Sequence, residues 1–171
     1  MTNADFESVV RKHQAMVYSI AFHFFRSSTN AEEVAQDVFL RLYLDRESLK
    51  SDLHTIAWLR RTTAHRCIDL IRRQKTKYEV PLDELPDSSI DSRETDPFLK
   101  ERLWRLIASL PEKQRMIVIL RFGEDMDVEE ISQTLQIPVR TVWSHLQRSM
   151  VILRERASRY LRKEDYEPIR K

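Results

Sequence analysis

Apolar residues recur every three or four positions along the first half of the chain, which is the spacing of one face of an α-helix. Residues 6–25, 31–44 and 55–74 each carry such a face, so the pattern predicts three helices. The turn before the second helix ends in Asn30, and Glu33 follows it at the spacing of a capping box. Asn30 is therefore the predicted N-cap of that helix.

The second half of the chain continues the helical pattern after a stretch that is rich in proline and acidic residues. A helix is predicted to begin near Phe98. Pro111 suits the first turn of the next helix, where its missing N–H costs nothing, and Gly123 is a natural end for that helix. The expected fold class is all-α, with two small helical domains joined by an acidic flexible linker.

Residues 127–156 carry the most informative pattern. Ile131 and Leu135 lie one helical turn apart, and residues 136–138 then interrupt the periodicity. The periodicity resumes at spacings of four, three and four through Val142, Leu146, Ser149 and Leu153. Two amphipathic helices joined by a tight turn, the second of them basic, predict a helix-turn-helix that places a recognition helix in the DNA major groove.

The opposite face of this predicted recognition helix is polar and basic. Arginine binds guanine edges, glutamine binds adenine, and hydroxyl groups serve either bases or phosphates. The candidate DNA-reading residues are Arg140, Thr141, Trp143, Ser144, His145, Gln147 and Arg148. The alternative is an ordinary solvated amphipathic helix, because basic helices are common.

Composition narrows the function. The chain has one glycine and one cysteine, and 33% of its residues are charged. A single cysteine excludes an internal disulfide and a cluster of cysteine metal ligands, and a single glycine excludes a Gly-rich phosphate loop. We therefore expect no metal, no cofactor and no catalysis by this chain alone. Neither a signal peptide nor a membrane-spanning run is evident, so we expect a cytoplasmic protein without membrane insertion.

Charge is distributed in three blocks, although the net charge is only +2. Residues 59–77 and 138–163 are strongly basic, and residues 79–99 between them are acidic. Two positive surfaces separated by a negative strap indicate two nucleic-acid contacts. The expected divisions of the chain are an N-terminal domain at 1–77, the acidic linker at 78–97 and a helix-turn-helix domain at 98–171.

The basic third helix is less specific than the recognition helix. Its arginines attract any polyanion. Trp58 and the nearby His65 add flat side chains of the kind that stack on unpaired bases in single-strand binders. The alternative, which stays open, is that Trp58 belongs to the core and that the arginines form a solvated face.

Three segments carry recognisable motifs: AEEVAQDVFLRLY at residues 31–43, AWLRRTTAHRCIDLIRRQK at 57–75, and SLPEKQRMIVILRF at 109–122. In this order, with an acidic stretch before the third, they resemble a bacterial extracytoplasmic-function (ECF) sigma factor of the small two-domain type. The resemblance extends over nearly the whole chain. It implies an alternative sigma factor that binds core RNA polymerase, directs it to promoters and helps to open the DNA.

The resemblance also implies roles for particular residues. The first segment would dock on the clamp helices of the largest polymerase subunit, through Glu33, Gln36, Asp37, Phe39 and Arg41. The second segment and the loop before it would receive an unpaired base and hold the downstream promoter element. Their residues are Lys50, Ser51, Asp52, Trp58, Arg60, Arg61, His65, Arg72 and Arg73. The recognition helix would read the upstream element as duplex.

Several residues depart from the family pattern. Gln136 stands where the turn usually has glycine or another small residue, so we expect Gln136 to tolerate the backbone of the turn or to shift it slightly. Trp143, His145 and Met150 stand at positions that are often basic, and His65 replaces a frequent asparagine. The sequence therefore predicts what these helices do more fully than which promoter they read.

The expected partners are core RNA polymerase, promoter DNA as duplex and as opened strand, and an anti-sigma factor. An alternative is a helix-turn-helix regulator that binds a palindromic operator without polymerase. A third possibility is an adaptor that binds only proteins, and the two basic surfaces argue against it. Docking and strand-opening surfaces in the first domain favour a sigma factor, whereas a symmetric interface or ligand pocket there favours a regulator.

Overall fold

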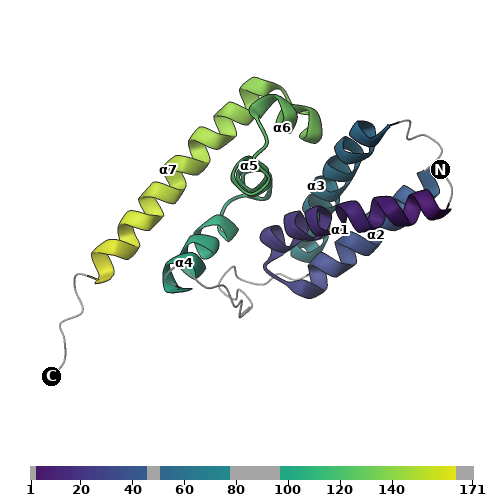
Figure 1. The fold of residues 1–171 in the computed structure, drawn as a ribbon. Coiled ribbons are helices and arrows are strands. Elements are labelled where there is room, and N and C mark those ends of the chain that lie inside the picture. Colours follow the sequence, from purple (N-terminus) through teal and green to yellow (C-terminus); the bar gives the residue numbers. More distant parts are fainter. Residues whose placement is uncertain (1–2, 46–50, 78–96, 165–171) are drawn as a thin grey trace.

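The computed structural model describes residues 3–45, 51–77 and 97–164. Within these residues the backbone forms seven α-helices and no strand, which confirms the expected all-α class. The helices are α1 (Asn3–Phe25), α2 (Ser28–Asp45), α3 (Asp52–Lys77), α4 (Pro97–Ala108), α5 (Glu112–Phe122), α6 (Val128–Leu135) and α7 (Val139–Glu164). They form an N-terminal half, α1–α3, and a C-terminal half, α4–α7, which lie side by side (Figure 1).

The N-terminal half is a three-helix bundle around a core of aliphatic and aromatic side chains. Helices α1 and α2 pack together, and α3 contacts both. Val17, Ile20 and Phe24 of α1 are fully buried, as are Val34 and Leu42 of α2. These residues belong to the apolar faces that the periodicity predicts, so the pattern placed the buried side of both helices correctly.

Two helices begin earlier than predicted, for the same physical reason. The hydroxyl of Ser27 accepts the N–H of Asn30 at 3.3 Å, so Ser27 caps α2 and the prediction of Asn30 as its N-cap is wrong. The hydroxyl of Ser51 likewise accepts the N–H of His54 at 3.3 Å at the start of α3. A serine oxygen satisfies a backbone donor that the helix itself leaves unpaired, so each helix extends back to its serine.

Helices α5 and α6 have well-defined ends. Pro111 is the N-cap of α5 rather than a residue of its first turn. Asp127 and Glu130 form a reciprocal capping box at the start of α6, with N–H to carboxylate distances of 2.7 and 2.9 Å. Gln136 ends α6 in the left-handed conformation, with φ 54° and ψ 45°, and its N–H donates to the carbonyl of Ser132. The turn therefore forms without glycine, as expected for Gln136.

A buried arginine connects the C-terminal half to α1. The guanidinium of Arg115 donates to the carbonyls of Ala108, the last residue of α4, and of Leu110, which lies between α4 and α5. It also donates to the carbonyl of Phe24 at 3.3 Å, at the end of α1. Burial lowers the pKa of Arg115 to about 10, against an opposing effect of Glu112, so the side chain stays charged at neutral pH.

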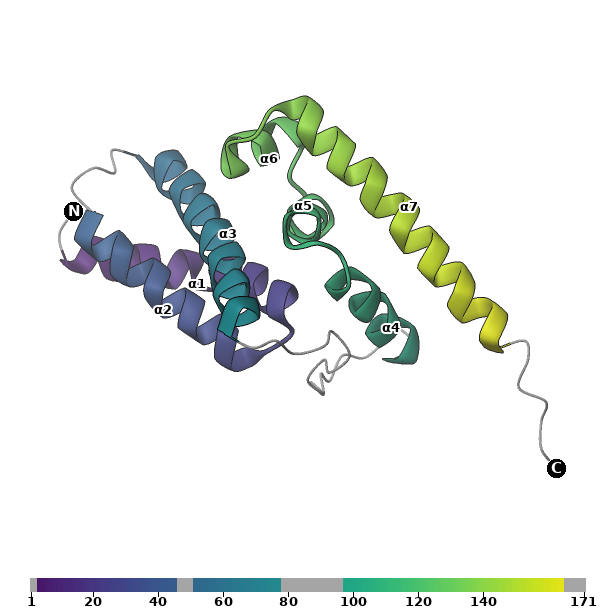
Figure 2. The ribbon, with the colours of Figure 1, turned by 180° about the vertical axis from the view of Figure 1, so that it is seen from behind.

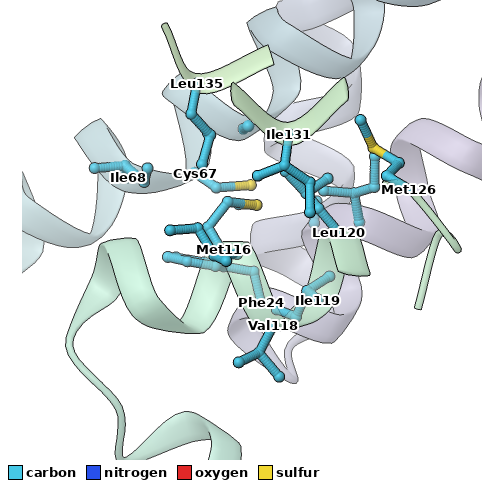
Figure 3. Packing of buried hydrophobic residues seen from close by; sticks show 14 of the residues in the cluster. Phe24, Cys67, Ile68, Met116, Val118, Ile119, Leu120, Met126, Ile131 and Leu135 are labelled. Atoms are coloured by element: carbon cyan, nitrogen blue, oxygen red, sulfur yellow. The ribbon is translucent and has the colours of Figure 1, made fainter. Parts of the chain in front are cut away.

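The two halves share one hydrophobic core. Helices α5 and α6 both contact α3, and α5 also contacts α1. Figure 3 shows Cys67 of α3 among Met116 of α5 and Ile131 and Leu135 of α6, and these four residues are buried, as is Ile68 of α3. The apolar cluster is therefore continuous from the first helix into the last.

Candidate nucleic-acid interface

Helix α7 presents the predicted recognition face to solvent. Val142, Leu146 and Ser149 are buried against the core, and Leu153 is half-buried, as the periodicity predicts. On the other side, Arg140, Trp143, Gln147 and Arg148 are exposed, whereas Thr141, Ser144 and His145 are half-buried. Within the described chain no ion pair engages either arginine. The face therefore has side chains available for base edges.

The hydroxyl of Ser149 links α7 to α5. It lies 3.3 Å from Oε1 of Gln114 on α5 and 2.8 Å from the carbonyl of His145. At the other end, the hydroxyl of Ser132 donates to the carbonyl of Ile137 at 2.6 Å and closes the turn between α6 and α7. These contacts and the apolar stripe determine which residues α7 turns outward.

His145 is less available than its neighbours. Within the described structure, its Nδ1 is buried without a hydrogen-bond partner. Burial lowers the pKa of His145, and the positive charges of Arg148 and Lys113 lower it further. The imidazole is therefore neutral at pH 7, so it adds no positive charge to the recognition face.

The predicted base-receiving loop before α3 is partly helical. Lys50 lies outside the described residues. Ser51 lies just before α3, whereas Asp52 stands in the first turn of α3, so the prediction of a loop is wrong for Asp52. Asp52 accepts a hydrogen bond from Lys12 of α1 at 3.0 Å, and this bond lowers the pKa of its carboxyl. Helix α1 therefore contributes a cation beside this end of α3.

The first half of α3 lines a groove of about 340 Å³ that it shares with α6. Trp58, Arg60 and Arg61 line it from α3, and each is half-buried. Nη1 of Arg60 lies 4.0 Å from Oε1 of Glu130, across the groove. Trp58 also packs against the core, so both interpretations of this side chain hold in part: one side is packed and the other faces the groove.

The second half of α3 lies against α5 and α6. His65 and Arg72 line a cavity of about 210 Å³ together with Lys113. Nε of Arg72 donates to Oε1 of Glu112 at 3.2 Å. Arg73 is exposed. The predicted downstream-element residues therefore divide between the two sides of α3 and do not form one continuous open surface.

The outer face of α2 contains the predicted polymerase-docking residues. Glu33, Gln36 and Arg41 are exposed, and Phe39 is half-buried against the core. Asp37, which the resemblance assigns to the same docking surface, is only partly exposed, because it pairs with Arg66 of α3 and its side chain keeps 33% of its accessible surface. The sequence of α2 alone gives no sign of Arg66, because this partner lies on another helix.

The sequence did not lead us to predict a groove that lies beside the outer face of α2. It has a volume of about 560 Å³ and runs between α1 and α2. Gln36 and Phe39 line it from α2, and the apolar faces of Val10, Ala15 and Tyr18 line it from α1. The signal was present in the sequence, since the apolar face of residues 6–25 is broader than a single buried stripe requires.

Two family matches cover most of the chain. Residues 9–77 match Sigma-70 region 2, and residues 100–153 match Sigma-70, region 4. The RNA polymerase sigma-E factor of Streptomyces avermitilis is 30% identical over 151 residues, which cover 88% of this chain and 84% of that protein. The chain belongs to the ECF sigma factors.

Further relatives agree with this family. The ECF RNA polymerase sigma factor SigW of Bacillus subtilis is 26% identical to this ECF sigma factor over 167 residues, covering 88% of this chain and 87% of SigW. The sigma factor RpoE from Bartonella quintana, solved with the anti-sigma factor NepR, has a TM-score of 0.72 at 17% identity. That match covers 88% of this chain and 95% of RpoE. CnrH, solved with the cytosolic domain of CnrY, has a TM-score of 0.68 at 19% identity, covering 92% and 90%. Both structures support the fold.

The family matches divide between the two halves of this sigma factor. The region 2 match contains α2 and α3, and the region 4 match contains α5, α6 and the first part of α7. In the described residues there is no group of three or more side chains suited to hold a metal ion. No helix among them is long and apolar enough to span a membrane.

Proposed function

We propose that this ECF sigma factor, which directs RNA polymerase to promoters, recognises each promoter with two separate basic helices. Residues 98–171 form the domain that binds the upstream element through α7, and residues 1–77 form the domain that binds the downstream element through α3. The acidic segment 78–97 links them. The observation that carries the proposal is that the region 2 match contains the long basic helix α3, and the region 4 match contains the first part of the long basic helix α7.

The upstream element is read by α7 as duplex DNA. The exposed Arg140, Gln147 and Arg148 supply donors that match guanine and adenine edges in the major groove. Arg154, farther along the same helix, is exposed and contacts backbone phosphate. The geometry is that of a helix-turn-helix, in which the second helix enters the groove.

The downstream element is held as opened DNA by α3. Strand separation is favoured by a site that binds extruded bases more strongly than stacked ones. Trp58 supplies a flat surface beside Arg60 and Arg61, which neutralise phosphates. The remaining positions assigned to this element, including Lys50 outside the described residues, extend the contact along the strand.

The polymerase docks on α2 and on the adjoining α1–α2 groove. Exposed polar side chains at Glu33, Gln36 and Arg41 surround the half-buried Phe39, which gives an apolar centre with a polar rim. Asp37 contributes mainly by holding α2 to α3 through Arg66. The protein acts stoichiometrically in the cytoplasm as an initiation factor and not as an enzyme.

An anti-sigma factor is a further proposed partner. RpoE and CnrH, which share this fold, were solved with NepR and with the cytosolic domain of CnrY, and NepR is an anti-sigma factor. A protein of that class would bind this chain and compete with polymerase or promoter DNA. The alternative of an operator-binding regulator is less supported, because both halves match sigma regions.

Run-off transcription tests the function. Core polymerase with this protein should start transcription at a subset of promoter fragments from the native genome, and polymerase alone should not. If no fragment gives a start that depends on the protein, the proposal fails. Binding of the protein alone to a palindromic operator, without any effect on polymerase, would favour the regulator instead.

Charge reversal on α2 tests the docking surface. Glu33→Arg should weaken polymerase binding about tenfold, because an exposed interface charge that becomes repulsive disfavours association. Glu155→Arg, at an exposed site on α7, is the matched control and should leave that affinity unchanged. Equal affinities for the two variants would remove Glu33 from the docking surface.

A further inference from the structure

Trp143 is a large apolar side chain that stands in solvent on the recognition helix. It lies at the start of the second turn of α7 and is 53% exposed. Val139 and Met150 lie on the same side of the helix, and both pack against the core. Within the described residues no aromatic ring or guanidinium stacks on the indole of Trp143. Packing inside the protein therefore gives no reason for a tryptophan at this position.

The neighbours of Trp143 on the outer surface of α7 are donors that are proposed to bind DNA bases. Arg140 precedes it by three residues and Gln147 follows it by four, so the three side chains share one side of the helix. All three are exposed. In a helix-turn-helix the N-terminal part of the second helix contacts the base edges. Trp143 therefore lies between two base-contacting positions and within reach of the bases.

The start of α7 is fixed by hydrogen bonds and faces away from the N-terminal half. The hydroxyl of Ser132 donates to the carbonyl of Ile137 in the turn before the helix. The carbonyl of Pro138 accepts the N–H groups of Thr141 and Val142 at 2.8 and 3.1 Å, which closes the first turn. Figure 1 and Figure 2 show α7 on the side of the C-terminal half that faces away from α3. The indole is therefore held in one place and is open to a DNA duplex.

The charge along α7 favours DNA as the molecule that covers Trp143. From Val139 to Arg154 the helix contains no acidic residue, and Arg140 and Arg148 are both exposed on it. A polyanion therefore approaches this length of the helix without repulsion. Its approach brings Trp143 against base edges, since the arginines on the same surface neutralise the phosphates that flank them.

The chemistry of an indole selects one group in the major groove. Indole has one N–H donor and no acceptor, so it cannot form the paired hydrogen bonds that arginine forms with guanine or glutamine with adenine. Most of its surface is apolar. The C5 methyl of thymine is the apolar group that base edges present in the major groove. Contact between the two removes apolar surface from water, and this favours binding in proportion to the area.

We propose that Trp143 recognises a thymine of the upstream element through the C5 methyl group of that base. The thymine lies between the base pairs that Arg140 and Gln147 contact, because Trp143 lies between these residues on α7. This inference rests on the proposed function, which assigns α7 to the upstream element. It adds the class of base that the element must contain and the residue that selects it.

Replacement of thymine by deoxyuridine tests the proposal, because it removes the methyl group and leaves every hydrogen-bonding group in place. Duplexes bound by the wild-type holoenzyme are first selected from a pool with a randomised upstream region. Each thymine of the selected element is then replaced singly in synthetic duplexes. At one position the wild-type holoenzyme should lose about fourfold in affinity, which is the value for burial of one methyl group.

Variants at two exposed sites of α7 connect this loss to Trp143. Trp143→Ala should bind the thymine duplex at least fourfold more weakly than wild type and should bind the thymine and deoxyuridine duplexes equally. Trp143→Phe should keep the preference for the methyl group, since an aromatic surface remains. Val151→Ala is the matched control, because Val151 is also 53% exposed but lies two turns farther along the helix, and it should keep the full preference. All three variants should retain the helical circular dichroism of wild type.

Flanking variants locate the thymine. The base pairs whose preference relaxes in Arg140→Ala and in Gln147→Ala should lie on either side of the methyl-dependent thymine. A methyl-dependent thymine outside that interval would contradict the assignment to Trp143.

Two further results would overturn the proposal. One is equal affinity of the wild-type holoenzyme for thymine and deoxyuridine at every position, and the other is the same fourfold loss in Trp143→Ala as in wild type. If Trp143→Ala weakens polymerase binding and leaves duplex affinity unchanged, Trp143 contacts a protein and not DNA. A wild-type holoenzyme that selects no duplex contradicts the proposed function itself, whereas a selected element without methyl dependence contradicts only the role of Trp143.

Discussion

Helices α3 and α7 are two long basic helices with different surroundings. Each has 26 residues, and each is strongly basic in sequence. In α7, Arg140 and Arg148 are exposed to solvent. In α3, Arg60, Arg66 and Arg72 each lie against a carboxylate from another helix. A similar composition thus gives solvent-exposed arginines on α7, and on α3 it gives arginines whose positive charge lies beside a carboxylate.

The difference follows from how many neighbours each helix has. Helix α7 packs on the other helices of the C-terminal half, so one apolar stripe faces inward and the rest of the helix is solvated. Helix α3 is packed between α1 and α2 on one side and α5 and α6 on the other. A helix with two packed sides must place some arginines near other elements, where only paired charges are tolerated.

The largest expected effect comes from removing the arginine that joins the halves. Arg115→Met should lower the free energy of unfolding by about 3–5 kcal/mol, because it leaves buried carbonyls without their charged donor. Urea denaturation monitored by circular dichroism measures the change. Since Arg115 also donates to the carbonyl of Phe24 at the end of α1, the variant should also weaken the contact between the two halves.

A second arginine of α5 provides the control for this variant. Arg121 is half-buried and donates to one carbonyl, that of Met126, at 3.2 Å. Arg121→Met should cost about 1 kcal/mol, the usual net value of one hydrogen bond. Equal losses for Arg115→Met and Arg121→Met would show that the burial of Arg115 adds nothing.

On α7, removal of an arginine should affect binding and not stability. Arg148→Ala should weaken upstream-element binding by about 1–3 kcal/mol and relax the preference for one base pair, if the side chain reads a base edge. Arg154→Ala should weaken binding to all sequences alike, as expected for a phosphate contact. Fluorescence anisotropy with matched and mismatched duplexes measures both, using holoenzyme. A sequence-independent loss for Arg148→Ala would reassign that residue to the backbone.

On α3, removal of an arginine should affect stability and not duplex binding. Arg66→Ala should lower the free energy of unfolding by about 1–2 kcal/mol, because it leaves the partly buried carboxylate of Asp37 without its donor. Arg73→Ala, at an exposed site on the same helix, should have no measurable effect on unfolding. A neutral Arg66→Ala would mean that the pair with Asp37 is only as strong as a surface ion pair.

The contrast between these helices also marks what the sequence could predict. Periodicity located the buried positions Val142, Leu146 and Ser149, because the inward face of a helix repeats with the helical turn. It could not find the partners of Arg66 or Arg115, since these lie on elements far away in sequence. Long-range pairing depends on how helices pack, and no local pattern records it.

The same limit explains the errors at helix ends and on α2. Several polar residues near each helix start could cap it, and the local sequence does not show that Ser27 and Ser51 are the ones that do. Asp37 was assigned to the docking surface together with its polar neighbours on α2, yet α3 supplies Arg66 beside it. The sequence therefore predicted which side of each helix is polar. It did not predict that α5 and α6 pack against α3.

The smallest expected effect concerns the turn that orients α7. Gln136 has φ 54°, a conformation that costs a residue with a Cβ more than it costs glycine. Gln136→Gly should therefore raise the free energy of unfolding by about 0.5–1 kcal/mol, after allowance for the greater freedom of glycine in the unfolded chain. Urea denaturation measures this gain, and upstream-element binding should stay the same because the backbone of the turn is retained.

A glycine inside α6 gives the opposite sign and serves as the control. Gln133 is exposed in the helix, so Gln133→Gly should lower stability by about 1 kcal/mol through helix propensity alone. If both variants are destabilised, the Gln136 side chain contributes more than its backbone conformation costs. If Gln136→Gly is more stable but binds the upstream element more weakly, then the stiffness of the turn helps to orient α7 toward DNA. Helix α3, in contrast, is held in place by the helices packed on both of its sides.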